Sequence, residues 1–484
     1  MLFNSIQFLI FFPIVTAIYF FLPKKGKNIF LLLASYYFYM SWKPEYVFLI
    51  LISTLIDYVC GIMMGKEEAK SGRRKYLLIS IFSNLGLLFS FKYLNFFSTS
   101  LNDLFAILNI FYNLPAYKLL LPVGISFYTF QTMSYTLDIY RGKLKPERNF
   151  KNFALFVTFF PQLVAGPIER ATKLLPQFEN EQRYDYQRVI DGIKLMLWGL
   201  FKKVVIADRL AFFVNHVYSQ PTQYEGAPLI IATIFFSFQI YCDFSGYSDI
   251  AIGSAQVLGF DLMDNFRRPY HSKSISEFWK RWHISLSSWF KDYLYIPLGG
   301  NRVAVPRWYF NIFVVFVVSG LWHGANWTFV VWGALHGFYS LVSIMTEKFR
   351  NRINNFTGLS DHIMLHKFWK VIFTFSLVTF SWIFFRANSI TDAFYIVTHL
   401  LPIDFSFLNI NSKVFLNQPI AEFYIAVLAI IFMETVHLLQ RHREMRHMFT
   451  KEPLWVKPVF YGALALLILL FGQFQLNQFI YFQF

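Results

Sequence analysis

The stretch VSGLWHGANWTFVVWGALHG, residues 318–337, decides the fold class because it joins two strongly apolar segments. It also places one histidine between them. The segments are residues 308–321 and 326–346, and the histidine is His323. Apolar runs of this kind predict membrane helices. Ionisable groups are costly at membrane depth, so a histidine found there is a functional candidate by default.

Composition extends this interpretation to the whole chain. Hydrophobic residues make up 56% of the 484 residues and charged residues 15%, against about 25% charged in an ordinary soluble domain. Because hydrocarbon can bury this apolar surface and a soluble core cannot, we predict a single all-α, polytopic membrane domain over residues 1–484. It has a motif-bearing core at 119–346, C-terminal helices at 368–484, and about 11 or 12 transmembrane helices. The candidate spans are residues 7–22, 29–41, 46–64, 76–91, 119–139, 193–214, 228–250, 308–321, 326–346, 371–386, 421–439 and 456–473.

Other apolar stretches are too short or too interrupted to span a membrane. Residues 101–112 and 152–165 are expected to be interfacial or re-entrant, and Pro161 and Pro167 break the run around the second of them. Residues 276–289 mix tryptophan with lysine and arginine, which predicts an amphipathic, interfacial helix.

The chain has only two cysteines, Cys60 and Cys242, and both lie in apolar segments. Two cysteines cannot form a disulfide framework or, alone, a structural zinc site. The sequence therefore predicts no metal site.

The net charge of +16 comes from lysines and arginines in short loops between spans. With the N-terminus outside, the loops 23–28, 65–75, 140–192, 251–307, 347–370 and 440–455 face the cytoplasm and hold 34 of the 44 basic residues. The external segments 42–45, 92–118, 215–227 and 387–420 hold four. This asymmetry predicts that both termini face outward, and it argues against nucleic-acid binding.

His323 has two possible roles on its local sequence. A neutral imidazole can accept a proton from a hydroxyl group, as a general base must, and Gly320 and Gly324 would allow a substrate or backbone to approach. A histidine that only packs between helices fits equally well. His336 would lie roughly 20 Å away on the opposite face if one helix joined the two. We therefore expect it to be structural or to line another level of the same cavity.

A second polar constellation lies in FQIYCDFSGYSDIAIG, residues 238–253. Asp243 and Tyr247 share one face of the predicted helix, with Asp249 elsewhere. These groups could line a cavity or bind a cation, but a structural role in tying helices together is favoured.

A third constellation, residues 278–302, is basic and aromatic. Lys280, Arg281, Lys291 and Arg302 form a cytoplasmic surface that suits an anionic donor such as coenzyme A. The same surface suits anionic lipid head groups equally well. His283, in the same stretch, is either a substrate contact or an interfacial anchor.

Five motifs in order resemble those of the membrane-bound O-acyltransferases, in the branch that acetylates alginate and peptidoglycan in bacteria. The resemblance covers nearly the whole chain, and SWIFFRANSITDAF (381–394) fits the same branch. The motifs are LPVGISFYTFQTMSYTLDIYRG (121–142), FPQLVAGPIER (160–170), QIYCDFSGYSDIAIG (239–253), FWKRWHISLSSWFKDYLYIPLGGNR (278–302) and GLWHGANWTFVVWGALHG (320–337).

The resemblance implies a ring of tilted helices around a central funnel in the bacterial cytoplasmic membrane. It implies that His323 is catalytic and that His283 is a second functional histidine. It also implies that an acetyl group from a cytosolic thioester, acetyl-CoA in the first place, crosses the membrane to a partner protein. The partner then passes it to an extracytoplasmic polysaccharide.

On this reading His323 takes the proton of the attacking hydroxyl, with Trp322 or Asn326 orienting the carbonyl and no acyl-enzyme formed. His336, Asp243 and Tyr247 are further candidates for lining the substrate tunnel. The alternatives are a D-alanyl transferase of the teichoic acid type and a transporter that moves an acyl donor or lipid without chemistry. A lipid acyltransferase is less favoured.

Overall fold

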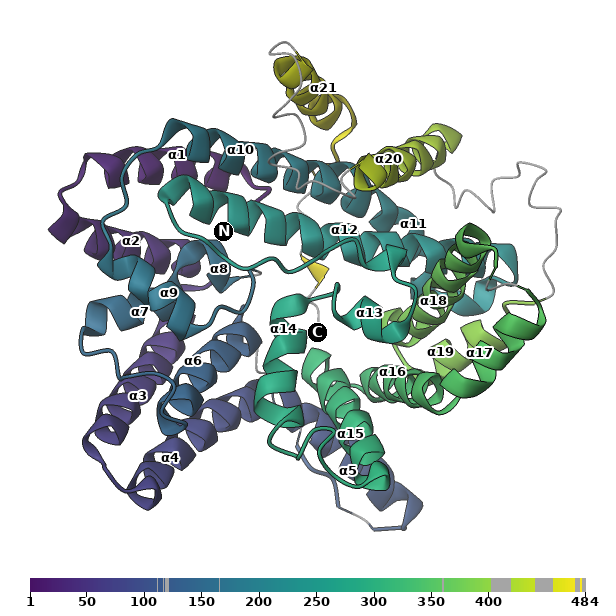
Figure 1. The fold of residues 1–484 in the computed structure, drawn as a ribbon, viewed down its shortest axis with the longest axis horizontal. Coiled ribbons are helices and arrows are strands. Elements are labelled where there is room, and N and C mark those ends of the chain that lie inside the picture. The colour runs from purple at the N-terminus through teal and green to yellow at the C-terminus, as the bar shows by residue number, and fades with distance from the viewer. Residues whose placement is uncertain are drawn as a thin grey trace. The chain divides into compact units, whose positions relative to one another are not determined.

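A computed structural model describes residues 1–484 except 111, 116, 118–121, 165, 359–360, 402–418, 440–455, 475–478 and 481–484. The described residues form helices and no strands, which confirms the all-α prediction (Figure 1). Tertiary contacts divide the chain into two compact units: residues 1–193 with 251–263, and residues 194–250 with 264–484. The prediction of a single domain is not tested by this division.

Unit 1 is built mainly from the N-terminal helices. A buried polar network joins three of them: the Ser80 hydroxyl donates to Asp57 at 2.6 Å, the Asn84 amide donates to Asp57 at 2.8 Å, and Thr136 lies 2.9 Å from Ser80. Such polar contacts hold helices together where lipid offers no hydrophobic drive. The helices are α1 Ile6–Phe21, α2 Lys24–Met40, α3 Val47–Lys66, α4 Lys70–Leu88, α5 Leu94–Ile107, α6 Ile125–Tyr140, α7 Phe150–Thr158, α8 Phe160–Leu163, α9 Ala171–Glu179 and the first half of α10 Tyr186–Leu200.

Unit 2 holds the remaining helices. The long helix α12 Ala227–Leu258 begins here and ends in unit 1. The others are α11 Asp208–Ser219, α13 Ile275–Trp279, α14 Ile284–Phe290, α15 Val305–His323, α16 Trp327–Met345, α17 Glu347–Phe356, α18 Ile363–Arg386, α19 Ile390–Thr398, α20 Ile420–Leu439 and α21 Val456–Phe471.

Seven helical runs in the described part of the chain are long and apolar enough to cross a membrane, and two shorter apolar helices accompany them. The protein is therefore a multi-pass membrane protein. Each expected span coincides at least partly with a helix, although residues 119–121 and the loop 440–455 lie outside the described residues. The expected number of 11 or 12 spans stays a prediction, because several of these helices are short. The seven runs are Pro44–Lys66, Lys70–Ile107, Ala227–Leu258, Val305–His323, Trp327–Met345, Ile363–Arg386 and Ile420–Leu439.

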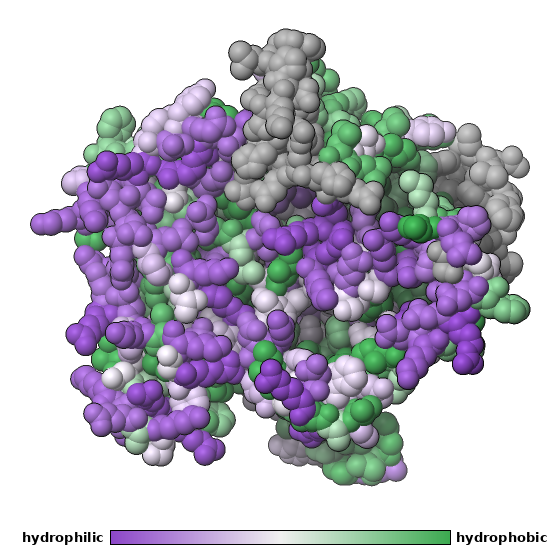
Figure 2. Space-filling model, viewed as in Figure 1, coloured by the Kyte–Doolittle hydropathy of each residue, from purple (hydrophilic) through white to green (hydrophobic). Residues whose placement is uncertain are grey.

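Large apolar side chains on the outside of these helices agree with a lipid environment. On α1, Leu9, Ile10 and Ile14 are each more than half exposed, a pattern that water would disfavour. Hydrophilic side chains gather instead over α7 and α9, as Figure 2 shows on one face of unit 1.

One sequence expectation about helices is wrong. Residues 276–289 do not form one helix: α13 ends at Trp279, and α14 begins at Ile284 after His283 in a left-handed conformation. Helix α5 continues the helical run from α4 through a π turn at Phe89–Tyr93 and ends at Ile107, so the interfacial or re-entrant placement of residues 101–112 stays a prediction.

Candidate active site

His323 lies at the end of a helical hairpin in unit 2. Helix α15 ends at His323, Gly324 is extended, and the Asn326 side chain caps α16 by accepting from the Thr328 amide at 3.0 Å. A Cβ on Gly320 would lie 2.2 Å from the Phe329 carbonyl, so only glycine permits this close approach of the two helices. Because the chain turns back, the premise that one helix separates His323 from His336 is wrong.

Aromatic rings surround the His323 imidazole. Trp332 stands edge-on to it with ring centroids 5.1 Å apart, and the Phe385 ring lies 5.6 Å away. His323 is 5% exposed, so the hairpin and α18 together exclude water from it. Helices α13, α16 and α18, which supply much of this aromatic packing, pack against one another in unit 2 (Figure 1).

The His283 ring lies 6.4 Å from the His323 ring, although forty residues separate them in sequence. His283 has φ 42°, a left-handed conformation that costs a non-glycine residue free energy, and it precedes α14. It is buried, and the Phe244 ring packs edge-on to it at 4.6 Å. The structure therefore brings the two predicted catalytic histidines together in one enclosed, aromatic site.

Asn265 orients His283. The Asn265 side-chain oxygen accepts from the Ser285 amide at 3.3 Å and from the Ser285 hydroxyl at 2.9 Å. The same oxygen lies 3.1 Å from His283 Nδ1. Because an oxygen held by two donors acts as an acceptor, Nδ1 carries the proton and the neutral ring has its lone pair on Nε2.

Electrostatics keep the His283 ring neutral. Burial holds the pKa of His283 well below the ordinary histidine range, and the neighbouring His323 lowers that pKa further. A neutral ring can accept a hydrogen bond through Nε2 at any physiological pH. The site can therefore accept a hydrogen bond from a substrate hydroxyl at a neutral side chain.

His336 has a structural environment. The Trp279 indole N–H donates to His336 Nδ1 at 3.3 Å, and Ser381 lies 2.9 Å from Nε2. With Nδ1 accepting, Nε2 donates to Ser381, whose hydroxyl donates in turn to the Val378 carbonyl at 2.8 Å. Both ring nitrogens are thus used in joining α13, α16 and α18, which supports the structural reading of this residue.

Asp243 lies in a buried ion-pair network. Lys203 is 2.6 Å from Asp243 and 2.9 Å from Asp208, and the Ile480 amide donates to Asp243 at 2.7 Å. The Lys203 ammonium also lies 5.4 Å from the centre of the Tyr247 ring. These contacts tie α12 to the π turn Phe201–Ala207 and to the C-terminal segment, which favours the structural role.

The other predicted site residues are spread more widely. Trp322 is partly exposed beside His323, and Asn326 combines its capping role with a 3.2 Å hydrogen bond to the Asn388 carbonyl. Arg281 pairs with Glu277 at 2.6 Å. The remaining donor-binding candidates, Lys280, Lys291 and Arg302, are exposed on the surface.

Sequence reasoning missed Asn265, Trp332 and Phe385. Asn265 lies in an irregular segment eighteen residues before His283, where no periodic pattern marks it. Trp332 and Phe385 look like ordinary apolar residues of membrane helices. They could have been identified from the sequence only if their contacts with His323 had been known.

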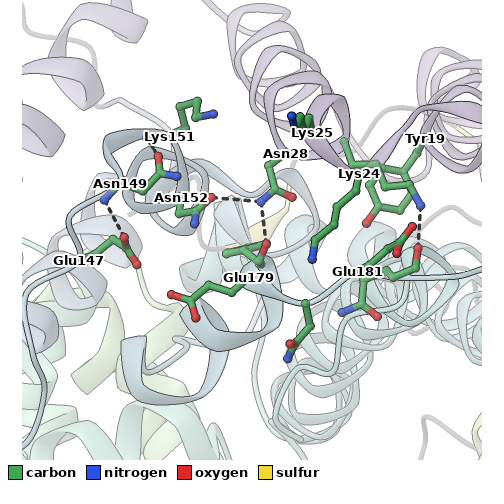
Figure 3. Close-up of a pocket in the computed structure, with 14 residues that line it drawn as sticks. Tyr19, Lys24, Lys25, Asn28, Glu147, Asn149, Lys151, Asn152, Glu179 and Glu181 are labelled. Atoms are coloured by element: carbon green, nitrogen blue, oxygen red, sulfur yellow. Dashed lines mark hydrogen bonds between the residues drawn. The ribbon is translucent and has the colours of Figure 1, made fainter.

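A separate hollow of about 520 Å³ lies in unit 1. Asn28 donates there to Asn152 at 3.1 Å, and Asn149 donates its backbone N–H to Glu147 at 2.7 Å (Figure 3). Four lysines and three glutamates line the hollow, so its charge is mixed. It contains neither candidate catalytic histidine.

Comparison with known proteins identifies the family. Residues 146–388 match the membrane-bound O-acyltransferase family. A probable alginate O-acetylase of Pseudomonas putida is 39% identical, over 81% of this chain and 78% of that protein. A peptidoglycan O-acetyltransferase of Helicobacter pylori is 34% identical over the same shares. A teichoic acid D-alanyltransferase of Bacillus subtilis is 26% identical, over 49% of this chain and 62% of that protein.

The matched residues 146–388 contain His283, His323, Asn265 and the aromatic residues around them. The resemblance inferred from the motifs is thereby confirmed. The chain belongs to the membrane-bound O-acyltransferase family and is an acyltransferase.

Proposed function

We propose that this protein transfers an acetyl group from a cytosolic thioester, acetyl-CoA in the first place, to a hydroxyl group. The final acceptor is an extracytoplasmic polysaccharide, reached through a partner protein on the outer face. The observation that carries the proposal is the enclosed pair of buried histidines, with ring centroids 6.4 Å apart. The relatives that match over most of their length are named as O-acetyl-transferring enzymes of bacterial polysaccharides.

The reaction needs one proton acceptor and one hydrogen-bond donor. The acceptor oxygen attacks the thioester carbonyl while His323 takes its proton, and the tetrahedral adduct collapses as the C–S bond breaks. The proton then passes to the leaving thiolate, so the products are an ester and a free thiol. His283, held by Asn265 with its lone pair on Nε2, positions the hydroxyl group or relays its proton.

Two buried indole groups can serve as donors to the developing oxyanion. The N–H groups of Trp332 and Trp382 are buried and have no hydrogen-bond partner among the described residues. Their rings stack at 5.6 Å, and Trp332 also packs on His323. A fixed donor in a dry site stabilises a developing negative charge strongly.

The decisive experiment compares His323→Gln with the unaltered protein in membranes supplied with radiolabelled acetyl-CoA. We expect the variant to fold, judged by its unfolding temperature, and to lose incorporation of label into surface polymer. His362→Gln, on an exposed histidine, is the matched control. A folded His323→Gln protein with full incorporation would overturn the catalytic role of His323.

The donor is tested separately. Acetyl-CoA and a D-alanyl carrier protein are supplied in turn to the same membranes, and label is followed into the polymer. The acetyl donor is favoured because the D-alanyl-transferring relative matches only 49% of this chain, at 26% identity. Label taken from the carrier protein alone would replace acetyl transfer with D-alanyl transfer.

The proposed location is the bacterial cytoplasmic membrane with both termini outward. The support is the concentration of basic residues in alternate loops. Single cysteines introduced at exposed Lys25 and Lys348 should react with an impermeant thiol reagent only after the membrane is opened. Reaction in intact cells would reverse the orientation.

A further inference from the structure

Three potential ligand side chains meet in unit 2, away from the two catalytic histidines. His271 Nε2 lies 2.7 Å from one oxygen of Glu434, and His437 Nδ1 lies 3.4 Å from the other. One nitrogen or oxygen from each residue lies within 4.8 Å of the other two. The cluster joins the turn Pro269–His271 to α20, 163 positions further along the chain.

The spacing on α20 suits a shared ligand. Glu434 and His437 are three residues apart, so both project from one face of the helix. The same Glu-x-x-His spacing places two ligands on one ion in metal-binding helical bundles. His271 then approaches the pair from a separate segment and supplies a third ligand.

The distances fit a small divalent ion after a modest opening. Zinc binds imidazole nitrogen and carboxylate oxygen at about 2.0–2.2 Å, so tetrahedral ligand atoms lie about 3.3 Å apart. The 3.4 Å separation of His437 from Glu434 already matches this spacing. The 2.7 Å separation of His271 from the other Glu434 oxygen must widen by about 0.6 Å to reach that spacing. A partly exposed side chain can make that adjustment, and His271 is 32% exposed.

The surroundings support His437 in the way that metal-bound histidines are supported. The Tyr241 hydroxyl lies 3.4 Å from His437 Nε2, the nitrogen that faces away from Glu434. A partner on the second nitrogen fixes the tautomer and the ring orientation of a ligating histidine. His437 is only 4% exposed, so its ring is held rigidly toward the cluster.

The chemistry of the ligands selects the class of ion. Two imidazoles and one carboxylate suit zinc and similar transition metals, whereas calcium and magnesium prefer sites built from oxygen. Glu434 is the one carboxylate in the cluster, and the neighbouring Arg268 guanidinium donates to the His437 carbonyl at 3.2 Å. The Lys202 ammonium lies 5.8 Å from the centre of the Tyr241 ring. The Asp249 carboxylate lies 2.7 Å from the same ammonium and neutralises its charge.

We propose that His271, Glu434 and His437 bind one divalent transition-metal ion, zinc in the first place, with a water molecule as the fourth ligand. The ion holds the turn Pro269–His271, which leads into the segment carrying His283, against α20. Its role is structural, and it takes no part in acyl transfer. The site is independent of the function proposed above.

The test measures metal directly on the purified full-length protein with any affinity tag removed. After chelation and dialysis against a small excess of Zn²⁺, elemental analysis should find about one zinc per chain. The chelated protein should unfold at a lower temperature than the reloaded protein. Loading with Co²⁺ should produce the visible absorption of a four-coordinate nitrogen and oxygen site.

His271→Ala is the main variant, because this residue is partly exposed and its loss should leave the chain folded. It should lose the zinc, the Co²⁺ spectrum and the rise in unfolding temperature, while His362→Ala keeps all three. Glu434→Gln, which retains the shape of the side chain, should weaken zinc binding at least tenfold. If the unaltered protein binds no zinc at this excess, the cluster is a hydrogen-bonded clamp without metal. If zinc stays bound to His271→Ala, the ion is held by other residues. Either result would overturn the proposal, whatever the outcome of the acetyl-transfer assays.

Discussion

Two pairs of histidines in unit 2 differ in what surrounds them. His283 and His323 face each other between aromatic rings, with an amide as the polar neighbour of His283. His271 and His437 instead converge on the carboxylate of Glu434. An imidazole among neutral groups can stay neutral and accept a substrate proton, whereas two imidazoles beside one carboxylate can serve as metal ligands. The partners of a histidine decide its role more than its burial does.

The largest expected effect is on His323. Replacing it with glutamine removes the proton acceptor, and general-base catalysis typically contributes 10²–10⁴-fold, so acetyl transfer should fall by at least about 100-fold. Initial rates of polymer labelling in membranes measure the change, after correction for the amount of folded protein. A loss smaller than about threefold would mean that His323 is not the base.

Changing Asn265 to aspartate tests whether the neutral character of the first pair matters. A carboxylate beside Nδ1 would favour the protonated ring and raise the pKa of His283 from its present low range. Activity should then fall as the pH drops through the raised pKa, because the protonated ring has lost the lone pair on Nε2.

Between about pH 6 and 8, the unaltered protein should lose no activity through protonation of His283. Asn265→Asp should be least active at the acid end of this range. The pH profile of the labelling rate distinguishes this from a structural defect, which would lower the rate at every pH. Identical profiles would contradict the role assigned to Asn265.

Removing metal from the second pair should affect stability more than chemistry. Chelation should lower the unfolding temperature, and the folded remainder should keep its acetyl-transfer rate, because the three proposed ligands include neither His283 nor His323. The pH profile should not change. A chelated protein that keeps its stability but loses all activity would move the ion into the reaction.

The smallest effect is expected at His336, which belongs to neither pair. His336→Gln should lower the free energy of unfolding by about 1–3 kcal/mol, because buried hydrogen-bonding groups on Trp279 and Ser381 lose their partner. The labelling rate per folded molecule should stay within about threefold. A loss as large as that of His323→Gln would place His336 in the catalytic site.

Much of the candidate site could be predicted from sequence, but not its geometry. The GLWHG and RWH motifs marked His323 and His283, and both lie in the enclosed site. The break at Gly324 falls in the gap between the predicted spans 308–321 and 326–346, but the close approach of the two helices at Gly320 was not foreseen. Asn265 was missed because an isolated asparagine in an irregular segment carries no periodic signal.

The sequence by itself determined that this is an all-helical, multi-pass membrane protein. Apolar composition and charge asymmetry can be read from the sequence without knowing which residues contact one another. Its ordered motifs also indicated the acyltransferase family. Only the tertiary structure decided which histidine meets which partner. His271 and Glu434 are 163 positions apart and His283 and Asn265 are 18 apart, and spacing within one element cannot predict contacts between side chains on different elements. These contacts distinguish the proposed acyl-transfer site from the proposed metal site in one chain.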